Sequence, residues 1–333
     1  MVKLNQGFSG TQLLCTSSDL FVIDLYSISL VSRVCAGKGN ASVDLRHIQN
    51  RQLSIPEMTI AIENELEATM KFEDAALTWH GDDKNVGFKT QIERLGVIAE
   101  AFIEGEVPTS PSIQAVIAQN CESEEGRVSL ISTHEQLLDG QTYNGCINPA
   151  SEKYREQIMD MGLKVGKYMA ERGVLGHFSV DFLANQSQDG SWELNAVEVN
   201  LRQGGTTHPH AALALLCGGC ICSSDGLFRT NDGEVRTYIA TDTYVHPNLK
   251  GLNESQVIDA IECRTNALAN KIRWSKGLGI GVVFHLFRFI EKYGRIGFTS
   301  IGRNREEAQT LYDTTLQFLE NVGNRTSVQT NNN

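Results

Sequence analysis

Residues 176–210 read GHFSVDFLANQSQDGSWELNAVEVNLRQGGTTHPH, and they decide the fold of this 333-residue chain. Two apolar segments, FSVDFLAN and WELNAVEVN, flank the polar turn SQDGS, which is typical of two strands joined in a hairpin. Asp181 interrupts the first strand, and the second ends in E-x-N-x-R. Polar residues inside otherwise apolar strands predict a site on this hairpin.

The polar residues of this hairpin suit a magnesium ion. Because strand side chains alternate between two faces, Glu198 and Asn200 share one face, and Asp181 can lie opposite them. Two carboxylates and an amide oxygen form the hard oxygen set that Mg²⁺ prefers. Arg202 lies on the same face and can hold a carboxylate or phosphate through two parallel hydrogen bonds. The alternative, a solvated hairpin with scattered charges, is disfavoured by the GGTTHP loop that follows directly.

The remaining chain predicts a mixed α+β order with hairpins rather than a βαβ series. Helical periodicity favours helices, and apolar runs bounded by turns favour strands. Ser151 is a candidate N-cap for its helix, and the segments after residue 323 are expected to be a disordered tail. The expected helices are 54–72, 151–173, 211–216, 256–272 and 304–322, and the expected strands beyond the hairpin are 97–105, 112–119, 127–138 and 279–287.

The composition indicates a soluble globular protein. Hydrophobic residues make up 41% and charged residues 21%, and the formal net charge of −11 disfavours nucleic-acid binding. The eight cysteines are irregularly spaced, which favours a reducing, cytoplasmic location over a disulfide framework. No leader or spanning segment is predicted, since acidic and hydroxyl residues interrupt the apolar stretch at 11–36.

The hairpin motif resembles the metal-binding end of the ATP-grasp superfamily, ligases that couple ATP to a carboxylate. VKLN near Lys3 resembles the strand whose lysine reaches the ATP phosphates, and VIAEAFIEG resembles the hinge strand that holds adenine. VEVNLRQGGTTHP and STHEQ together resemble the branch of pheganomycin-type peptide ligases and the ATP-grasp domain of IQ motif-containing protein H. The resemblance covers most of residues 1–10 and 38–322.

This resemblance implies a role for each matching residue. Lys3 and Arg202 would be catalytic, Lys3 at the ATP phosphates and Arg202 at the acyl-phosphate. The remaining ligand residues fall into three groups: a phosphate loop of Gly7, Ser9, Gly10, Gly39 and Asn40; an adenine and ribose hinge of Glu100, Phe102, Ile103, Glu104 and Glu106; and an Mg²⁺ site of Asp181, Glu198 and Asn200.

The implied fold is an ATP-grasp fold of two α+β subdomains with a C-terminal α/β extension. Its expected parts are a small subdomain at 1–95, a core at 96–225, the C-terminal region at 226–322 and the tail at 323–333. The implied function is an ATP- and Mg²⁺-dependent ligase joining a small carboxylate to an amine, such as an amino acid or peptide. Superfamily members normally have a further N-terminal domain, so we expect a truncated chain or a partner subunit.

Two other classes of function are alternatives to the ligase. A nucleotide-binding scaffold or regulatory module without turnover fits the resemblance to IQ motif-containing protein H. A metal-dependent hydrolase would need a water-activating base beside the metal set, and the sequence offers no strong candidate.

Several weaker signals favour structural roles. Cys217, Cys220 and Cys222 lack a second ligand pair at zinc-site spacing, so packing at a helix end is favoured. His285 lies in an apolar strand and is expected in the core. His134 is as consistent with a structural histidine as with a base or substrate contact, and His177 stands where the resemblance leads us to expect an arginine.

An apolar insert splits the expected phosphate loop. GFSG ends at Gly10 and GKGNA begins at Gly37, and removing residues 11–37 restores one glycine-rich loop. Gly-Thr and Ala-Gly codons at the two borders can carry the GT and AG ends of an intron. We therefore hypothesise that residues 11–37 are translated intron; a genuine apolar hairpin is the alternative.

Overall fold

The computed structural model describes residues 31–36, 39–44, 54–69, 71–72, 78–82, 86–90, 98–101, 109–119, 127–139, 142–187 and 189–330. The chain divides into two compact units, one of Met1–Pro108 with Asn195–Glu198, the other of Thr109–Leu194 with Val199–Asn333. Within the described residues, no helix combines the length and apolar character needed to cross a membrane.

The first unit contains a four-stranded antiparallel sheet in the order β3-β2-β1-β4. The segment between β2 and β3 forms the helix predicted over 54–72, and that prediction is confirmed with slightly shorter bounds. The hinge strand predicted over 97–105 is described only for its first part, β4. The elements are β1 (Val31–Ala36), β2 (Gly39–Asp44), α2 (Ile55–Thr69), β3 (Lys71–Phe72) and β4 (Ile98–Ala101).

The second unit is organised by a ten-stranded sheet. Its main path runs β10-β11-β12-β7-β6-β5-β8-β9, and β14 pairs with both β12 and β13. The predicted hairpin is confirmed, since β8 is the neighbour of β9 in the sheet. The strands predicted over 112–119 and 127–138 are also confirmed, and they pair antiparallel as β5 and β6. The strands are β5 (Pro111–Ile117), β6 (Val128–Asp139), β7 (Thr142–Asn148), β8 (Gly176–Gln186), β9 (Trp192–Asn200), β10 (Cys220–Ile221), β11 (Phe228–Arg229), β12 (Val235–Val245), β13 (Gly281–His285) and β14 (Arg295–Gly302).

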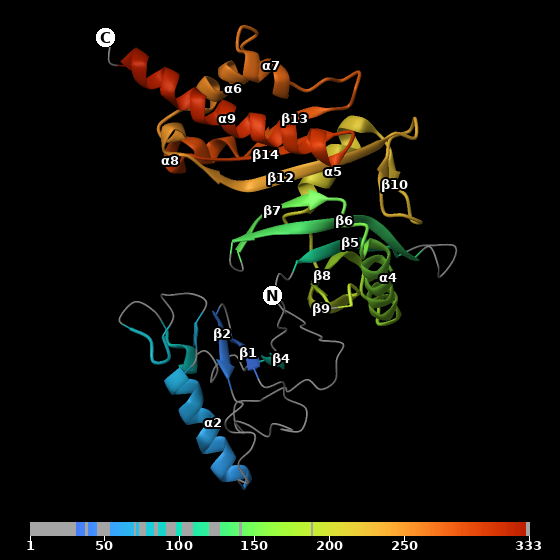
Figure 1. The fold of residues 1–333 in the computed structure, drawn as a ribbon, viewed down its shortest axis with the longest axis vertical. Helices are drawn as coiled ribbons and strands as arrows, with labels where there is room; N and C mark the ends of the chain where they lie inside the picture. Colours follow the sequence, from blue (N-terminus) through green and yellow to red (C-terminus); the bar gives the residue numbers. More distant parts are fainter. Residues whose placement is uncertain are drawn as a thin grey trace. The chain divides into compact units, whose positions relative to one another are not determined.

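Two helices cover this sheet at different places (Figure 1). Helix α4 (Arg155–Glu171) packs on β5, β6 and β8, and α9 (Arg305–Thr330) runs along β14 and β12. Gly162 allows α4 to approach closely, because a Cβ there would clash with the Ile113 side chain in β5. The shorter helices are α5 (Thr207–Cys217), α6 (Glu254–Glu262), α7 (Ala267–Ile272) and α8 (Ile290–Tyr293), with 3-10 turns at Pro247–Leu249 and Phe287–Phe289.

One buried cluster of apolar side chains lies where α9 meets β14 and β13. Phe298 and Phe318 are fully buried there, and Leu319 and Ile296 pack in the same cluster. A second cluster surrounds Tyr238 in β12. Burial of such large apolar side chains contributes about 1.5–3 kcal/mol each, so these clusters hold the C-terminal part of the sheet against its helices.

Three predictions about helix ends differ from the structure. The single helix predicted over 256–272 is wrong, because Asn266 accepts hydrogen bonds from Leu268 N and Ala269 N and begins a separate helix, α7. Ser151 is not the N-cap of α4; residue Tyr154 occupies that position without a side-chain cap. Helix α9 continues to Thr330, past the expected start of the tail at residue 323.

Candidate active site

Asp181 is the centre of the polar groups predicted on the hairpin. It lies in β8 opposite Ser112 of β5, and the Ser112 hydroxyl donates a hydrogen bond of 2.7 Å to Asp181 Oδ1. Asn200 Nδ2 donates to the other oxygen, Oδ2, at 3.2 Å. Asp181 is half-buried and Ser112 is buried, so the carboxylate is held in a fixed orientation.

Arg202 extends this series of hydrogen bonds toward solvent. Its side chain is exposed, and one guanidinium nitrogen donates to Asn200 Oδ1 at 3.4 Å while another donates to Gln203 O at 3.2 Å. The series Ser112–Asp181–Asn200–Arg202 thus joins three of the predicted site residues. The exposed guanidinium lies beside Asn200 and can meet an anionic ligand that arrives from solvent.

The oxygen chemistry of this series fits the expected magnesium ion. Asp181 supplies carboxylate oxygens, and Glu198 is a half-buried carboxylate two residues before Asn200 in β9. Asn200 turns its amide nitrogen toward Asp181, and a half-turn of that amide would direct its oxygen there instead. The residue types therefore match a hard cation.

The GGTTHP segment is fixed to the same strand, β5, that supports Asp181. Thr207 N donates to Gly204 O at 3.1 Å, and Gly204 N donates to Thr207 Oγ1 at 3.0 Å, which closes a tight turn. Thr207 Oγ1 donates to Gln114 Oε1 at 2.9 Å, and Gln114 Nε2 also contacts Thr206 Oγ1. Ser112 and Gln114 are both buried, and because they are two residues apart in β5 their side chains lie on the same face of the strand.

The other predicted site residues lie outside this arrangement. Gly39 and Asn40 begin β2, where they pair with Ala36 and Cys35 of β1, and Glu100 lies in β4 opposite Arg33. The roles proposed for them remain predictions. The predicted residues outside the described part of the chain are Lys3, Gly7, Ser9, Gly10, Phe102, Ile103, Glu104 and Glu106.

Part of the predicted insert lies in the first sheet. Residues 31–36, which belong to the segment 11–37, form β1 between β2 and β4, and residues 11–30 lie outside the described residues. Strand β1 hydrogen-bonds along both edges, with Val34 opposite Ala41 on one side and Ala99 on the other. This segment therefore has a defined place in the structure, while its origin remains a hypothesis.

The structure shows where the histidines and cysteines of the weaker sequence signals lie. His134 is fully buried with Nε2 2.8 Å from the Tyr238 hydroxyl, which favours the structural role. His177 is exposed on β8. Cys217 donates to Gly279 O at 3.4 Å and Cys222 contacts Ser224 Oγ at 3.0 Å, so these cysteines have separate partners, as the packing interpretation expects.

Cys146 is a further buried thiol of the second unit. It lies in β7 between Gln136 of β6 and Ala240 of β12, with no exposed surface. Burial raises the pKa of its thiol to about 12; a hydrogen bond from Tyr143 acts in the opposite direction. The thiol is therefore neutral and unreactive in the folded protein.

Sequence reasoning missed one polar cluster. His285, expected in the core, retains 22% side-chain exposure and lies 2.9 Å from Asp242 Oδ1, with His208 also within reach. Burial raises the pKa of Asp242, but hydrogen bonds and charge from the two histidines outweigh it and hold that pKa below its usual value. The available signal was Asp242 itself, a lone carboxylate inside the strand YIATDTYV.

Residues 87–216 match the family model described as IQCH-like, ATP-grasp. The L-propargylglycine–L-glutamate ligase of Streptantibioticus cattleyicolor is 29% identical over 222 residues, which span 66% of this chain and 42% of that enzyme. Residues 87–216 of the chain are therefore similar to the ATP-grasp family, and the chain aligns with less than half of the length of that relative.

Solved structures show a weaker likeness. The L-amino acid ligase from Bacillus licheniformis has a TM-score of 0.44 and 16% identity, covering 91% of this chain and 64% of that one. The N5-carboxyaminoimidazole synthetase from Staphylococcus aureus, complexed with ADP, has a TM-score of 0.46 and 13% identity, covering 92% and 66%. With TM-scores below 0.5, neither structure carries weight for the function of this chain.

Proposed function

We propose that this chain binds Mg-ATP and joins a small carboxylate to an amine. The observation that carries the proposal is the series Ser112–Asp181–Asn200–Arg202, which lies inside the segment that matches the ATP-grasp family model. The matching relative is a ligase of two amino acids, which supports an amino acid as the carboxylate or amine.

The proposed reaction has two steps. A carboxylate oxygen of the substrate attacks the γ-phosphorus of ATP, the bond to the β-phosphate oxygen breaks, and ADP leaves with an acyl-phosphate formed. The amine nitrogen then attacks the acyl carbon, phosphate leaves, and the amine gives up a proton to solvent. The products are an amide, ADP and phosphate.

The residues of the chain would position the reactants rather than take part in covalent chemistry. Arg202 would hold the carboxylate or acyl-phosphate through its guanidinium. Asp181, Asn200 and Glu198 would hold Mg²⁺, which when bound neutralises the charge of the ATP phosphates. Ser112 would keep Asp181 in the orientation that this requires, because its hydroxyl occupies one carboxylate oxygen.

The test measures ADP release by the purified chain with Mg-ATP and a panel of amino acids. We expect release that depends on an added amino acid, and amide product by mass spectrometry. Arg202→Ala should lower kcat about 100-fold, as is typical when a preorganised charge on the reacting groups is lost. Arg202→Lys should recover only part of this loss, since it keeps the charge but not the planar fork.

The matched control is Arg172→Ala. Arg172 is also an exposed arginine of the second unit, but it stacks on the Tyr168 ring at the end of α4. Its loss should leave ADP release unchanged. Saturable ATP binding without amino-acid-dependent ADP release would contradict the ligase and favour the nucleotide-binding module instead.

A further inference from the structure

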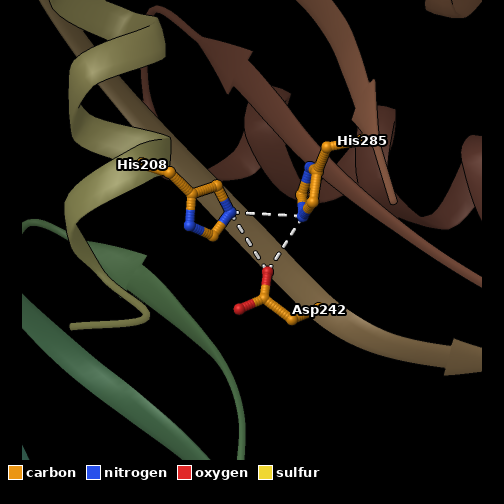
Figure 2. Close-up of side chains that lie close together, drawn as sticks. All are labelled: His208, Asp242 and His285. Carbon is orange, nitrogen blue, oxygen red and sulfur yellow. Dashed lines mark hydrogen bonds and ion pairs between the residues drawn. The ribbon is translucent and has the colours of Figure 1, made fainter. Parts of the chain in front are cut away.

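Three potential metal ligands meet in the second unit, and none of them belongs to the Ser112–Asp181–Asn200–Arg202 series, although His208 lies in the GGTTHP segment. Figure 2 shows His208 from α5, Asp242 from β12 and His285 from the end of β13 pointing toward one another. His285 Nε2 lies 2.9 Å and His208 Nε2 lies 3.1 Å from the same oxygen, Asp242 Oδ1. The two Nε2 atoms are 3.2 Å apart.

These three separations suit atoms that share one metal ion. Imidazole nitrogen and carboxylate oxygen bind zinc-class ions at about 2.1 Å, which places neighbouring ligand atoms about 3.0 Å apart at octahedral angles and about 3.4 Å apart at tetrahedral angles. The observed triangle lies close to that range. The ion would sit above the triangle, on the side from which further ligands approach.

Hydrogen bonds alone do not account for all three contacts. Each Nε2 carries at most one hydrogen and the carboxylate carries none, so two protons at most serve three close contacts. If both nitrogens donate to Asp242 Oδ1, the contact between the two nitrogens has no proton between them. A cation satisfies the lone pairs of all three atoms at once.

The surrounding fold directs Asp242 toward the histidines. The register between β12 and β14 shifts between Thr241 and Tyr244, so Asp242 lies in a β-bulge. Thr241 Oγ1 and Thr243 Oγ1 both donate to Asn144 O in β7, at 3.0 and 3.2 Å, which anchors the bulge on either side of Asp242. Bulges commonly redirect a side chain beside a functional site.

A glycine provides the space for the His285 ring. Gly297 of β14 pairs with His285, and a Cβ at residue 297 would overlap the His285 ring at Nε2. The His285 ring therefore occupies the space beside Gly297, and its Nε2 is directed to Asp242 (Figure 2). Any larger residue at position 297 has to displace this ligand atom.

The cluster is accessible from solvent. The side chain of His208 is 45% exposed, while those of Asp242 and His285 are 18% and 22% exposed. Asp242 and His285 are thus the more buried pair of ligands, and His208 is the ligand nearest to solvent. An ion bound here keeps a coordination position for water or a small ligand, as metal sites with three protein ligands do.

We propose that His208 Nε2, Asp242 Oδ1 and His285 Nε2 bind one divalent ion of the zinc class with at least one open coordination position. Two imidazoles favour zinc, cobalt or iron over Mg²⁺ and Ca²⁺, which prefer oxygen ligands. The site is therefore chemically distinct from the oxygen set around Asp181. It does not depend on the proposed ligase reaction.

The experiment uses the full chain, stripped with a chelator, in the absence of nucleotide. Co²⁺ and Zn²⁺ are titrated separately. We expect one Co²⁺ per chain with visible d–d absorption, displaced by one equivalent of Zn²⁺, and unaffected by a tenfold excess of Mg²⁺. A near-ultraviolet thiolate band would instead assign the ion to exposed cysteines and overturn the proposal.

Substitutions test the three ligands individually. His208→Ala, His285→Ala and Asp242→Asn should each weaken Co²⁺ binding by more than about 100-fold, since loss of even an outer-shell partner costs 10–100-fold. Gly297→Ala should weaken it about 10-fold or more by displacing the His285 ring. Circular dichroism of each metal-free variant checks that the fold is retained. If an alanine variant fails to fold, Co²⁺ binding by the nearly isosteric Asp242→Asn still tests the site.

His80→Ala is the matched control. His80 Nε2 lies 2.9 Å from Glu67 Oε1, so it also forms a histidine–carboxylate pair, but both side chains are more than half exposed. Its loss should leave Co²⁺ binding unchanged. Wild-type protein that binds no Co²⁺, or ligand variants that bind it as tightly as wild type, would refute the site. Asp181→Asn should abolish ligase turnover while leaving Co²⁺ binding intact, which separates the two proposals.

Discussion

At the scale of single residues, the orientation of Asp181 depends on a hydroxyl from another strand. Ser112 is buried and donates to Oδ1, while Asn200 donates to Oδ2. Each carboxylate oxygen thus accepts a hydrogen bond from a neutral group. These two hydrogen bonds fix the direction in which the carboxylate points.

Removing the Ser112 hydroxyl should reduce turnover without unfolding the protein. A net hydrogen bond to a charged group contributes about 1.5–3 kcal/mol, so Ser112→Ala should lower kcat about 10-fold and lower the unfolding free energy by about 1–2 kcal/mol. Steady-state ADP release and urea unfolding measure the two effects. Ser112→Thr, which retains the hydroxyl, should restore turnover; equal loss in both variants would argue that volume, not hydrogen bonding, matters here.

A buried histidine should make stability depend on pH. Burial, with a smaller contribution from His210, lowers the pKa of His134 well below its usual value. Below about pH 6.5 the unfolded chain binds a proton at this position and the folded chain does not, so the free energy of unfolding decreases as pH falls, by about 1.4 kcal/mol per pH unit.

The variant His134→Gln isolates this effect. Glutamine can still reach the Tyr238 hydroxyl but does not titrate. Unfolding free energies measured by urea titration between pH 6.5 and 5 should decline less steeply in the variant, by about 1 kcal/mol per pH unit on average. Identical slopes would show that His134 is protonated in the folded state.

At the scale of elements, alternation made the β8–β9 hairpin predictable. Asp181, Asn200 and Arg202 are close in sequence, and strand geometry alone brings them together. The cluster of His208, Asp242 and His285 was not predictable in this way. Its members come from three elements, and a bulge, whose position depends on pairing with β14, turns Asp242 toward the others. The break between α6 and α7 similarly depends on one asparagine inside a helical pattern.

Strand β1 provides the test of the predicted insert. Deleting residues 11–37 removes a strand that lies between β2 and β4, and joins GFSG directly to KGNA. We expect the shortened chain to fold, because VKLN has strand character and can replace β1, and to bind ATP more tightly through the restored loop. Isothermal titration and circular dichroism measure this. An unfolded or aggregated deletion product would identify β1 as a native strand, and the mature transcript sequence would decide its origin.

At the scale of the whole molecule, the excess of acidic residues affects how strongly an anionic ligand can bind. The formal net charge is −11, yet the proposed ligand is an anion. Free ATP therefore meets an unfavourable long-range field, and binding depends on local cations. Arg202 and a bound metal ion are two local positive charges that the proposed site can supply.

Magnesium should consequently decide whether ATP stabilises the chain. A ligand that binds only the folded state at 100 times its Kd stabilises that state by about 2.7 kcal/mol. We expect a rise in the thermal midpoint with Mg-ATP, little rise with ATP plus a chelator, and little rise with Mg-ATP in Asp181→Asn. A rise with ATP that does not require Mg²⁺ would contradict the assignment of the Asp181 set.

The buried Cys146 gives the folded sheet a built-in reporter. Its thiol lies between two neighbouring strands and is neutral, so a thiol reagent modifies it only while the strands are apart. In a variant whose other cysteines are replaced by serine, the alkylation rate of Cys146 under native conditions would measure how often these strands separate. A substrate that holds the strands together should lower the alkylation rate, which provides a readout of ligand binding that does not depend on turnover.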